Sequence, residues 1–516
     1  MHENIGHVFN HSSSPGMAPT LCSRCGDAVD EGCDPSDELA ELDALLERIK
    51  LKRLNAKRKI NRLHSSIIRR LPPDVMSTIF EFCLPYFTYH HDQFLDFFQN
   101  NFFFPLSLGV ICSYWRDIAW SAPSLWSSLV VRVTSKHDPH IIAGIAQEWL
   151  ARSGQLPLSI RISAYNNNLK TVSALANIIN RYSTRWSDLD LRIPPGCYRR
   201  FHAIDNHAPT LKSIRFSSFD DATSLNFRLT CPRLERASLE KLPMNGSNIQ
   251  WDNLTHLNLR SMSSIDIFLI LRKTPRLVTC IVLGCTTRYI QQNTGALLLT
   301  SLRSLHLPMG FAEDILNNII APHLEELNLP NYHNPSMEVI TSFLRRSACP
   351  LRFFYLAFRS LPPRSEWSRF FFRSINILSV TSFFDYPRED HDLWNILKLV
   401  AKVLSSQSTS PQQGLLPNLK ILEYTGRLRP PAGNLDTLVN TLPPANNAFR
   451  GPLHLLKLDL YPITRIPKKM LSYFSSLEER GVTVKVLSDS EDIRVLQSSI
   501  DYYRRREEFF FPRLGG

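Results

Sequence analysis

Apolar residues return in one short alternating pattern along most of the chain. The pattern is a hexad with apolar side chains at positions 1, 4 and 6, and it starts at residues 186, 211, 234, 254, 277, 302, 324, 351, 375, 419 and 453. Alternation with a period of two is typical of a half-buried β-strand. The segments LVVRV from residue 129 and LSIRI from residue 158 alternate in the same way and predict two earlier strands.

The connections between these segments predict how the strands are arranged. Each hexad up to residue 375 starts 20 to 27 residues after the one before it, and helical patterns lie between several of them, at 141–152, 266–272, 313–320, 337–346 and 393–404. Repeats of this length bury their apolar faces only by stacking on their neighbours. The fold class predicted for residues 129–487 is therefore α/β, a solenoid of parallel strands, followed by a C-terminal helix and tail over residues 488–516.

Prolines precede five of the predicted strands at the same distance. Each stands two residues before the first apolar residue of its hexad, at Pro209, Pro232, Pro275, Pro322 and Pro417. We expect these prolines to end the incoming helix and to start the extended chain, because proline lacks an N–H and fixes φ.

A different pattern, with helical spacing, occupies residues 69–128. Pro73 fits the first turn of a helix, and Val75, Ile79 and Phe82 recur every three or four residues after it. A second helix is predicted from apolar positions at i, i+3, i+4, i+7 and i+10, which are Leu108, Ile111, Cys112, Trp115 and Ile118. Because so few short helices cannot bury a sizeable core, we expect a partner to cover part of their apolar surface.

The segments RRLPPDV, CSYWRD and PSLW within this region resemble the F-box. That resemblance implies docking on the Skp-type adaptor of cullin-RING ubiquitin ligases. The link over residues 86–104 is longer and more aromatic than in the usual F-box. The positions that match the motif, and that the resemblance implies as adaptor-binding, are Leu71, Pro72, Val75, Ile79, Phe80, Leu108, Cys112, Trp115, Pro123, Leu125 and Trp126.

The hexads resemble leucine-rich repeats in an irregular form, and the whole layout resembles the F-box protein families expanded in mushroom-forming fungi. The resemblance implies a non-catalytic subunit that recruits a substrate protein to a ubiquitin ligase. The alternative is a repeat-based scaffold that binds a partner outside any ligase. No cofactor is expected in either case.

Position 5 of each hexad predicts where a substrate binds. Its side chain points away from the buried leucines, and parallel stacking aligns these residues in a row. The row is Arg215, Ser238, Asn258, Ile281, His306, Asn328, Tyr355, Ser379, Glu423 and Lys457. We expect its middle, from Asn258 through Ile281, His306 and Asn328 to Tyr355, to touch the substrate, with the inserted segments 405–414 and 426–450 as the alternative.

Residues 39–68 carry a heptad pattern, and much of the net positive charge lies in and just after this segment. Apolar residues step three and four positions from Leu39 to Ile67, with Arg53 in the seam. This predicts a helix laid on the F-box or at most a weak parallel dimer, with a monomer as the default. Residues 47–70 hold ten Lys or Arg against Glu47 alone, within a net charge of +12. We interpret this cluster as a solvated helix face rather than a nucleic-acid site, because no aromatic residues interleave with it.

The remaining candidates for chemistry are incomplete. In the polar tail, residues 1–38, Cys22, Cys25 and Cys33 leave a zinc knuckle and free thiols as alternatives, because a second ligand pair is missing. The other cysteines fall in apolar patterns and are expected to be reduced and buried. His90, His91 and Asp92 lack convergent partners, and phosphate-loop and hydrolase motifs are absent, so we do not expect an enzyme. Without a signal peptide or membrane span, an intracellular, cytoplasmic or nuclear protein is expected.

Overall fold

The structure is a computed structural model, and it describes sixteen stretches of the chain. They are residues 35–64, 71–84, 104–134, 138–164, 168–218, 227–285, 296–307, 312–329, 336–358, 374–382, 392–409, 416–427, 435–443, 452–461, 466–488 and 499–501. The chain forms two compact units, Met1–Ala122 and Pro123–Gly516. Within the described stretches, no helix combines the length and the apolar character needed to cross a membrane.

The described part of the first unit is helical. Its helices are α1 (Pro35–His64), α3 (Pro73–Phe82), α4 (Phe104–Ile111) and α5 (Ser113–Ser121). The predicted heptad helix is confirmed as α1, and its seam residues are exposed, for example Leu39 at 62%, Leu46 at 49% and Ile60 at 55%. From Leu39 to Ile60, the part of the stripe whose side chains the structure describes, the apolar seam residues of α1 therefore contribute no core.

The predicted second helix over residues 108–118 is wrong in one respect, because it is broken at Cys112. This residue is extended, with φ −158° and ψ 167°, and its sulfur accepts a hydrogen bond from the backbone N–H of Trp115 at 3.4 Å. Cys112 is thus the N-cap of α5, and α4 ends directly before it. Apolar spacing alone does not reveal such a break, because the residues on both sides keep the helical period.

The described residues of the first unit form a small core. Met76 and Phe80 of α3 are buried, as are Leu108 of α4 and Ile118 of α5. The ring of Phe80 lies against Trp115, with centroids 5.0 Å apart and planes inclined at 54°.

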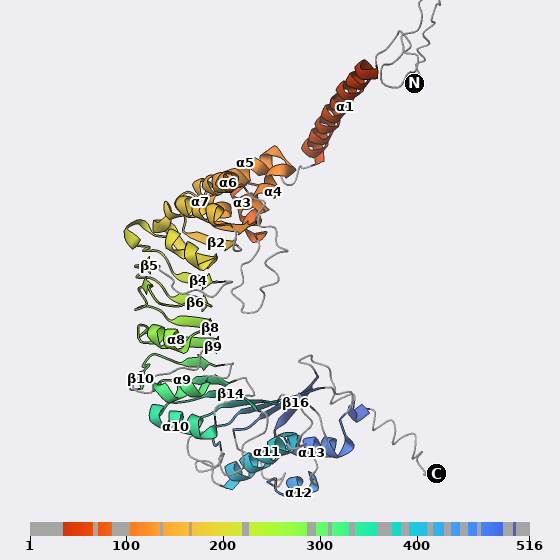
Figure 1. Cartoon of the computed structure of the whole chain (residues 1–516). Coiled ribbons are helices and arrows are strands. Elements are labelled where there is room, and N and C mark those ends of the chain that lie inside the picture. The colour runs from red at the N-terminus through yellow and green to blue at the C-terminus, as the bar shows by residue number, and fades with distance from the viewer. Residues whose placement is uncertain are drawn as a thin grey trace, which may run out of the picture. The chain divides into compact units, whose positions relative to one another are not determined.

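The second unit is organised by one open, parallel sheet of 14 strands (Figure 1). The strands lie in chain order, so each repeat pairs with the next. They are β1 (Ser128–Val133), β2 (Leu158–Ala164), β3 (Trp186–Arg192), β4 (Ser213–Ser217), β6 (Arg236–Glu240), β8 (His256–Met262), β9 (Thr279–Cys285), β11 (Ser304–His306), β13 (Glu326–Leu329), β14 (Phe353–Phe358), β15 (Ile377–Ser382), β16 (Ile421–Arg427), β17 (Leu455–Tyr461) and β18 (Thr483–Leu487).

Every predicted hexad, and both earlier segments, is confirmed as a strand of this sheet. The apolar residues at positions 4 and 6 are buried throughout, as Leu257 and Leu259 are on β8 and Leu422 and Tyr424 on β16. The residues between them are half-buried or exposed. Parallel sheets of most α/β proteins are covered on both faces, whereas this sheet keeps one polar face, which is consistent with a solenoid-like α/β fold.

Helices supply the other side of the core. They are α6 (Pro139–Arg152), α7 (Leu169–Asn180), α8 (Ser264–Leu271), α9 (Ala312–Asn318), α10 (Met337–Ser347), α11 (Asp392–Thr409), α12 (Leu435–Val439) and α13 (Lys468–Glu478). Contacts join α6 to β1, α8 to β8, α11 to β16 and α13 to β18. The helices expected between the hexads are confirmed, except that residues 319–320 leave α9 and form β12 (Ile319–Ile320).

The prolines before the strands do not have the expected role. Each is the second residue of a tight turn that the first leucine of the hexad closes, as when the N–H of Leu277 donates to the carbonyl of Thr274 at 3.2 Å around Pro275. The same bond joins Leu324 to Ala321 around Pro322. Proline suits this position because the second residue of such a turn needs φ near −60°.

Short strands and 3₁₀ turns occupy several of the connections between the main strands. Two two-residue pairs run parallel, β5 (Arg228–Leu229) with β7 (Asn248–Ile249), and β10 (Leu297–Leu298) with β12. Single 3₁₀ turns occupy other connections, at η2 (Pro123–Trp126), η3 (Ser183–Arg185), η4 (Pro195–Arg200) and η5 (Ile204–Asn206). The inserted segment expected over 405–414 is partly helical, because α11 continues to Thr409.

Candidate functional site

The predicted row of position-5 residues is confirmed as a line across the sheet. Asn258 on β8 pairs in register with Ile281 on β9, and Ile281 pairs with His306 on β11. His306 then pairs with Asn328 on β13, and Asn328 with Tyr355 on β14. All five side chains are half-buried on the polar face of the sheet. The register therefore gathers residues from five repeats onto one surface.

The row is longer than the sequence analysis proposed. It continues before Arg215 through Asp190 on β3 and Arg161 on β2. Arg161 Nε lies 2.9 Å from Asp190 Oδ2, and Arg215 Nη1 lies 3.7 Å from the same oxygen. Burial raises the pKa of Asp190, and the two guanidinium groups oppose this effect. The hexad WSDLDL carries Asp190 at position 5, so the same spacing rule locates it.

Three polar side chains meet in the middle of the row. The Oγ of Ser304 donates to Glu326 Oε2 at 2.8 Å and lies 3.0 Å from His306 Nε2, while His306 Nε2 lies 3.2 Å from Glu326 Oε1. A catalytic serine triad needs a histidine that bridges the serine and the carboxylate through its two different ring nitrogens. Here one nitrogen faces both partners, so Ser304, His306 and Glu326 do not form that relay.

Asn328 and Tyr355, the next two residues of the row, present polar groups to the same surface. The Oδ1 of Asn328 is shielded from solvent and accepts no hydrogen bond from the described residues. Leaving a buried acceptor unsatisfied costs about 1–3 kcal/mol. Burial raises the pKa of Tyr355, and Glu326 and Glu423 raise it further, so its hydroxyl keeps its proton and can donate.

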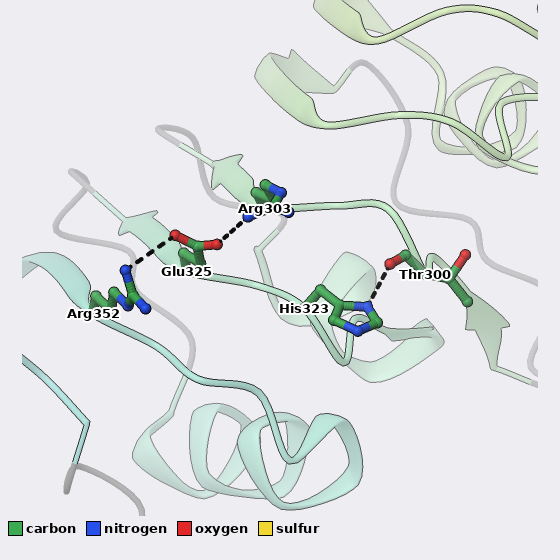
Figure 2. A network of polar contacts seen from close by, with 5 residues as sticks. All are labelled: Thr300, Arg303, His323, Glu325 and Arg352. Carbon is green, nitrogen blue, oxygen red and sulfur yellow. Dashed lines mark hydrogen bonds and ion pairs between the residues drawn. The ribbon is translucent and has the colours of Figure 1, made fainter.

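A charged network borders this face where the strands begin (Figure 2). Glu325, directly before β13, lies between Arg303 and Arg352, which precede β11 and β14. Its Oε1 pairs with Arg303 Nη1, and its Oε2 lies 3.9 Å from Arg352 Nη1. The arginine side chains are 63% and 56% exposed. One carboxylate facing two exposed guanidinium groups leaves this border with net positive charge.

A further polar contact joins the turns that precede these strands. His323 Nδ1 lies 2.6 Å from the carbonyl oxygen of Thr300, which links the turns before β13 and β11. Each of the position-2 residues also continues a backbone ladder, since the N–H of Glu325 donates to Arg303 and that of Arg352 to Glu325. The charged side chains therefore start from fixed backbone positions.

The predicted adaptor-binding residues divide by exposure. Within the first unit, Val75 and Ile79 are 40% and 41% exposed, and Pro72 is exposed too. Leu71, Cys112 and Trp115 are half-buried. Phe80 and Leu108 are buried in the core of that unit.

The closing part of the motif belongs to the second unit. Pro123 is exposed, whereas Leu125 and Trp126 are each 1% exposed. Trp126 packs on Trp149 of α6, and the guanidinium of Arg152 lies 5.2 Å from the centre of its ring. The side chains of Leu125 and Trp126 are thus part of the core at the start of the sheet.

Helices α3 and α4 also carry exposed apolar residues that the motif comparison did not include. Phe82 of α3 is 86% exposed, and Val110 and Ile111 of α4 are 79% and 52% exposed. Val75, Ile79 and Phe82 follow at i, i+4 and i+7, so they share one face of α3. The signal that locates Phe82 is the same helical spacing that predicted α3.

The other candidate sites of the sequence analysis receive no support from the described residues. Cys22, Cys25 and Cys33, the triplet from His90 to Asp92, and nearly all of segment 86–104 lie outside the described residues. Within the stretches that the structure describes, no group of three or more His, Cys, Asp or Glu side chains could hold a metal ion.

Of the seven described cysteines, Cys197, Cys231 and Cys280 are buried as expected, whereas Cys112, Cys285 and Cys349 are half-buried. Burial raises the pKa of Cys231 and Cys280 to about 12 and that of Cys349 to about 11. Their thiols therefore stay protonated at neutral pH. The expectation is wrong for Cys83, which is exposed at the end of α3.

A scan of the sequence against models of protein families finds no match, and a search of curated proteins finds none.

Proposed function

We propose that this chain is the substrate-recognition subunit of a Skp–cullin–F-box type ubiquitin ligase. Helices α3 to α5 bind the Skp-type adaptor, and the polar face of the parallel sheet binds the substrate protein. The chain carries out no reaction itself, and it raises the rate of ubiquitin transfer by holding the substrate near the catalytic subunits.

The apolar surface of α3 and α4 carries this proposal. A helical unit with so small a core leaves Val75, Ile79 and Phe82 in solvent on one face of α3, and Val110 in solvent on α4. A cluster of large exposed apolar side chains marks an interaction site in a soluble protein. The F-box resemblance of the surrounding segments supplies the kind of partner.

The sheet face supports the second half of the proposal. The row from Asn258 to Tyr355 combines an apolar residue, an aromatic hydroxyl, an imidazole and a shielded amide oxygen without a described donor. Tyrosine and polar groups at fixed positions are suited to anchoring a protein partner. Substrate binding by this row stays a proposal beside the scaffold alternative.

Co-purification with a Skp-type adaptor from a mushroom-forming fungus separates the two alternatives. A ligase subunit forms a stoichiometric complex with the adaptor, and Val75→Asp with Ile79→Asp abolishes that complex. A scaffold that acts outside a ligase does not bind the adaptor at all. Asp74→Asn, on an exposed residue of the same helix, is the matched control that leaves binding unchanged.

A further inference from the structure

The polar face of the sheet changes character between β13 and β14. At position 3 of the hexads, the paired residues from Ser128 on β1 to Glu326 on β13 are polar or charged. On the next four strands the same line holds Phe353, Ile377, Ile421 and Leu455, paired in register. These four residues form what we call the C-terminal apolar stripe. Each of them is half-buried rather than part of the core.

The alternation of the strands shows that the stripe is not core. Phe354, Leu378, Leu422 and Leu456, one residue further along each strand, are buried at 0% exposure. Adjacent residues on a strand point to opposite faces, so the stripe lies on the face that is polar elsewhere. An ordinary solvent-facing row does not place four large apolar residues side by side.

Positive charge borders the stripe. Arg352 and Lys420 directly precede Phe353 and Ile421, and both are exposed. Arg352 shares the carboxylate of Glu325 with Arg303, so that group is not neutralised (Figure 2). On the other side of the stripe, Glu423 and Lys457 lie 3.5 Å apart and cancel. The partner that fits therefore carries acidic residues along the flank that meets Arg352 and Lys420.

The spacing of the stripe selects the shape of the partner. Neighbouring strands lie about 4.8 Å apart, so the four side chains span roughly 14 Å across the sheet. An α-helix presents one apolar residue per turn every ~5.4 Å, and four successive turns match this span. An extended peptide presents a side chain on one face only every ~6.7 Å, so its second such side chain falls between strands and it cannot contact all four residues of the stripe.

We propose that the C-terminal apolar stripe binds an amphipathic helix of a partner protein, laid across β14 to β17, with Asp or Glu on the flank beside Arg352 and Lys420. The inference rests on the proposed substrate-recognition role, because this helix is the part of the substrate that the chain recognises. Tyr355, next to the stripe on β14, joins this surface to the row of position-5 residues.

Charge argues against the chain's own C-terminal segment as the occupant. Residues 502–516 contain aromatic residues, but their four arginines outnumber their two glutamates. This segment has the same sign as the border of the stripe, so the border repels it. A helix with the opposite charge gains from the same residues.

A peptide selection tests the inference. A display library of random 16-residue peptides is selected on the full chain, and the recovered peptides are titrated against three variants. They are Ile377→Ser with Ile421→Ser in the stripe, Arg352→Glu with Lys420→Glu at its border, and Val130→Ser, a half-buried apolar residue of the same face on β1. Circular dichroism establishes that each variant is folded.

We expect the recovered peptides to carry apolar residues every three or four positions and acidic residues on one flank. The stripe variant weakens their binding at least about tenfold, and Val130→Ser leaves it unchanged. The border variant also weakens the binding of these acidic peptides, because it places negative charge beside their acidic flank. Peptides with strict alternation, equal binding to wild type and stripe variant, or peptide binding that appears only after residues 502–516 are deleted would each overturn the inference.

Adaptor binding is measured on the same proteins, so that a failure of the helix-docking inference can be distinguished from a failure of the proposed function. If the wild-type chain binds the adaptor but the recovered peptides bind the stripe variant as tightly as the wild type, only the docking of a helix is wrong. If peptides bind as expected and the adaptor does not, only the ligase role is wrong.

Discussion

Trp126 packs edge-on against Trp149, with ring centroids 4.9 Å apart and an interplanar angle of 74°. Trp149 Nε1 also donates to the carbonyl of Ser128 at 3.0 Å, which ties α6 to the first strand. The residue that closes the F-box-like segment in sequence is therefore one that starts the core of the sheet unit. A parallel solenoid needs such a cover, because its first strand has no preceding repeat to stack on.

Replacing Trp126 tests this role. We expect Trp126→Ala to lower the free energy of unfolding of the sheet unit by about 3–5 kcal/mol, the usual cost of removing a fully buried tryptophan. Urea unfolding followed by circular dichroism measures this loss. Pro123→Ala, at an exposed position in the same turn, is the control and costs less than about 1 kcal/mol. Equal stability of both variants would show that Trp126 is not a core residue.

Two glycines give opposite predictions for one substitution. A Cβ at Gly109 of α4 would clash with the ring of Trp120, whereas a Cβ at Gly144 of α6 meets nothing within 4 Å. Gly109→Ala should destabilise the first unit by about 1–3 kcal/mol through overpacking. Gly144→Ala should stabilise the second unit by up to about 1 kcal/mol, because alanine favours the helix interior. Thermal unfolding of the two variants checks the signs, and a gain at Gly109 would contradict the packing of Trp120.

Much of the fold follows from the sequence because one rule governs it. A strand that buries every second residue shows an alternation of apolar and polar residues in its sequence. Because the repeats stack in chain order, equivalent positions of successive strands then pair with each other. The pairing in register of Asn258, Ile281, His306, Asn328 and Tyr355 follows from this rule. Two-residue strands such as β5 and β12 have no period to detect. The break at Cys112 escapes prediction because cysteine is not among the residues that usually cap helices.

The site is less predictable than the fold. The convergence of Arg303 and Arg352 on Glu325 depends on side-chain conformations that no spacing rule supplies. The C-terminal apolar stripe is different, because position 3 of the hexads at 351, 375, 419 and 453 is apolar in the sequence itself. It becomes visible once register shows that Phe353, Ile377, Ile421 and Leu455 are neighbours.

Buried cysteine gives a prediction for pH. Burial raises the pKa of Cys280 to about 12, while the same thiol in the unfolded chain has a pKa near 8.5. Between these values the unfolded state loses a proton that the folded state keeps, so stability falls as pH rises above about 9. From pH 7 to pH 10 we expect this residue to remove about 1–2 kcal/mol of stability. Urea unfolding of wild type and Cys280→Ala at both pH values isolates the effect, and an identical loss in the two proteins would contradict it.

The reactivity of exposed Cys83 provides a separate test of the burial of Cys231 and Cys280. Iodoacetamide at pH 8 should label Cys83 rapidly, and Cys231 and Cys280 only at the rate at which the second unit opens, because a buried protonated thiol is a poor nucleophile. Mass spectrometry of the labelled peptides measures both rates. Comparable rates at Cys83 and Cys280 in the absence of urea would show that the core of the sheet is accessible.

Alanines at Asn258, Ile281, His306, Asn328 and Tyr355 test the row of position-5 residues. The five side chains are half-buried on the polar face, so we expect the sheet to stay folded and the co-purifying substrate to be lost. The matched control replaces His256 and Thr279, which lie on the neighbouring line of the same face. If folding and the partner set both remain unchanged, recognition lies elsewhere, with the inserted segments 405–414 and 426–450 as the alternative.

The proposed ligase role is tested most directly by the affinity of the purified chain for a Skp-type adaptor. Isothermal titration should give a one-to-one complex for the wild type, and Leu71→Ala with Pro72→Ala should weaken it by about 2–4 kcal/mol if these residues are anchors of the interface. Ser113→Ala, at an exposed position of α5, should leave the affinity unchanged. A wild-type chain without measurable affinity, or a Leu71 and Pro72 variant that binds as tightly as the wild type, would contradict the assignment.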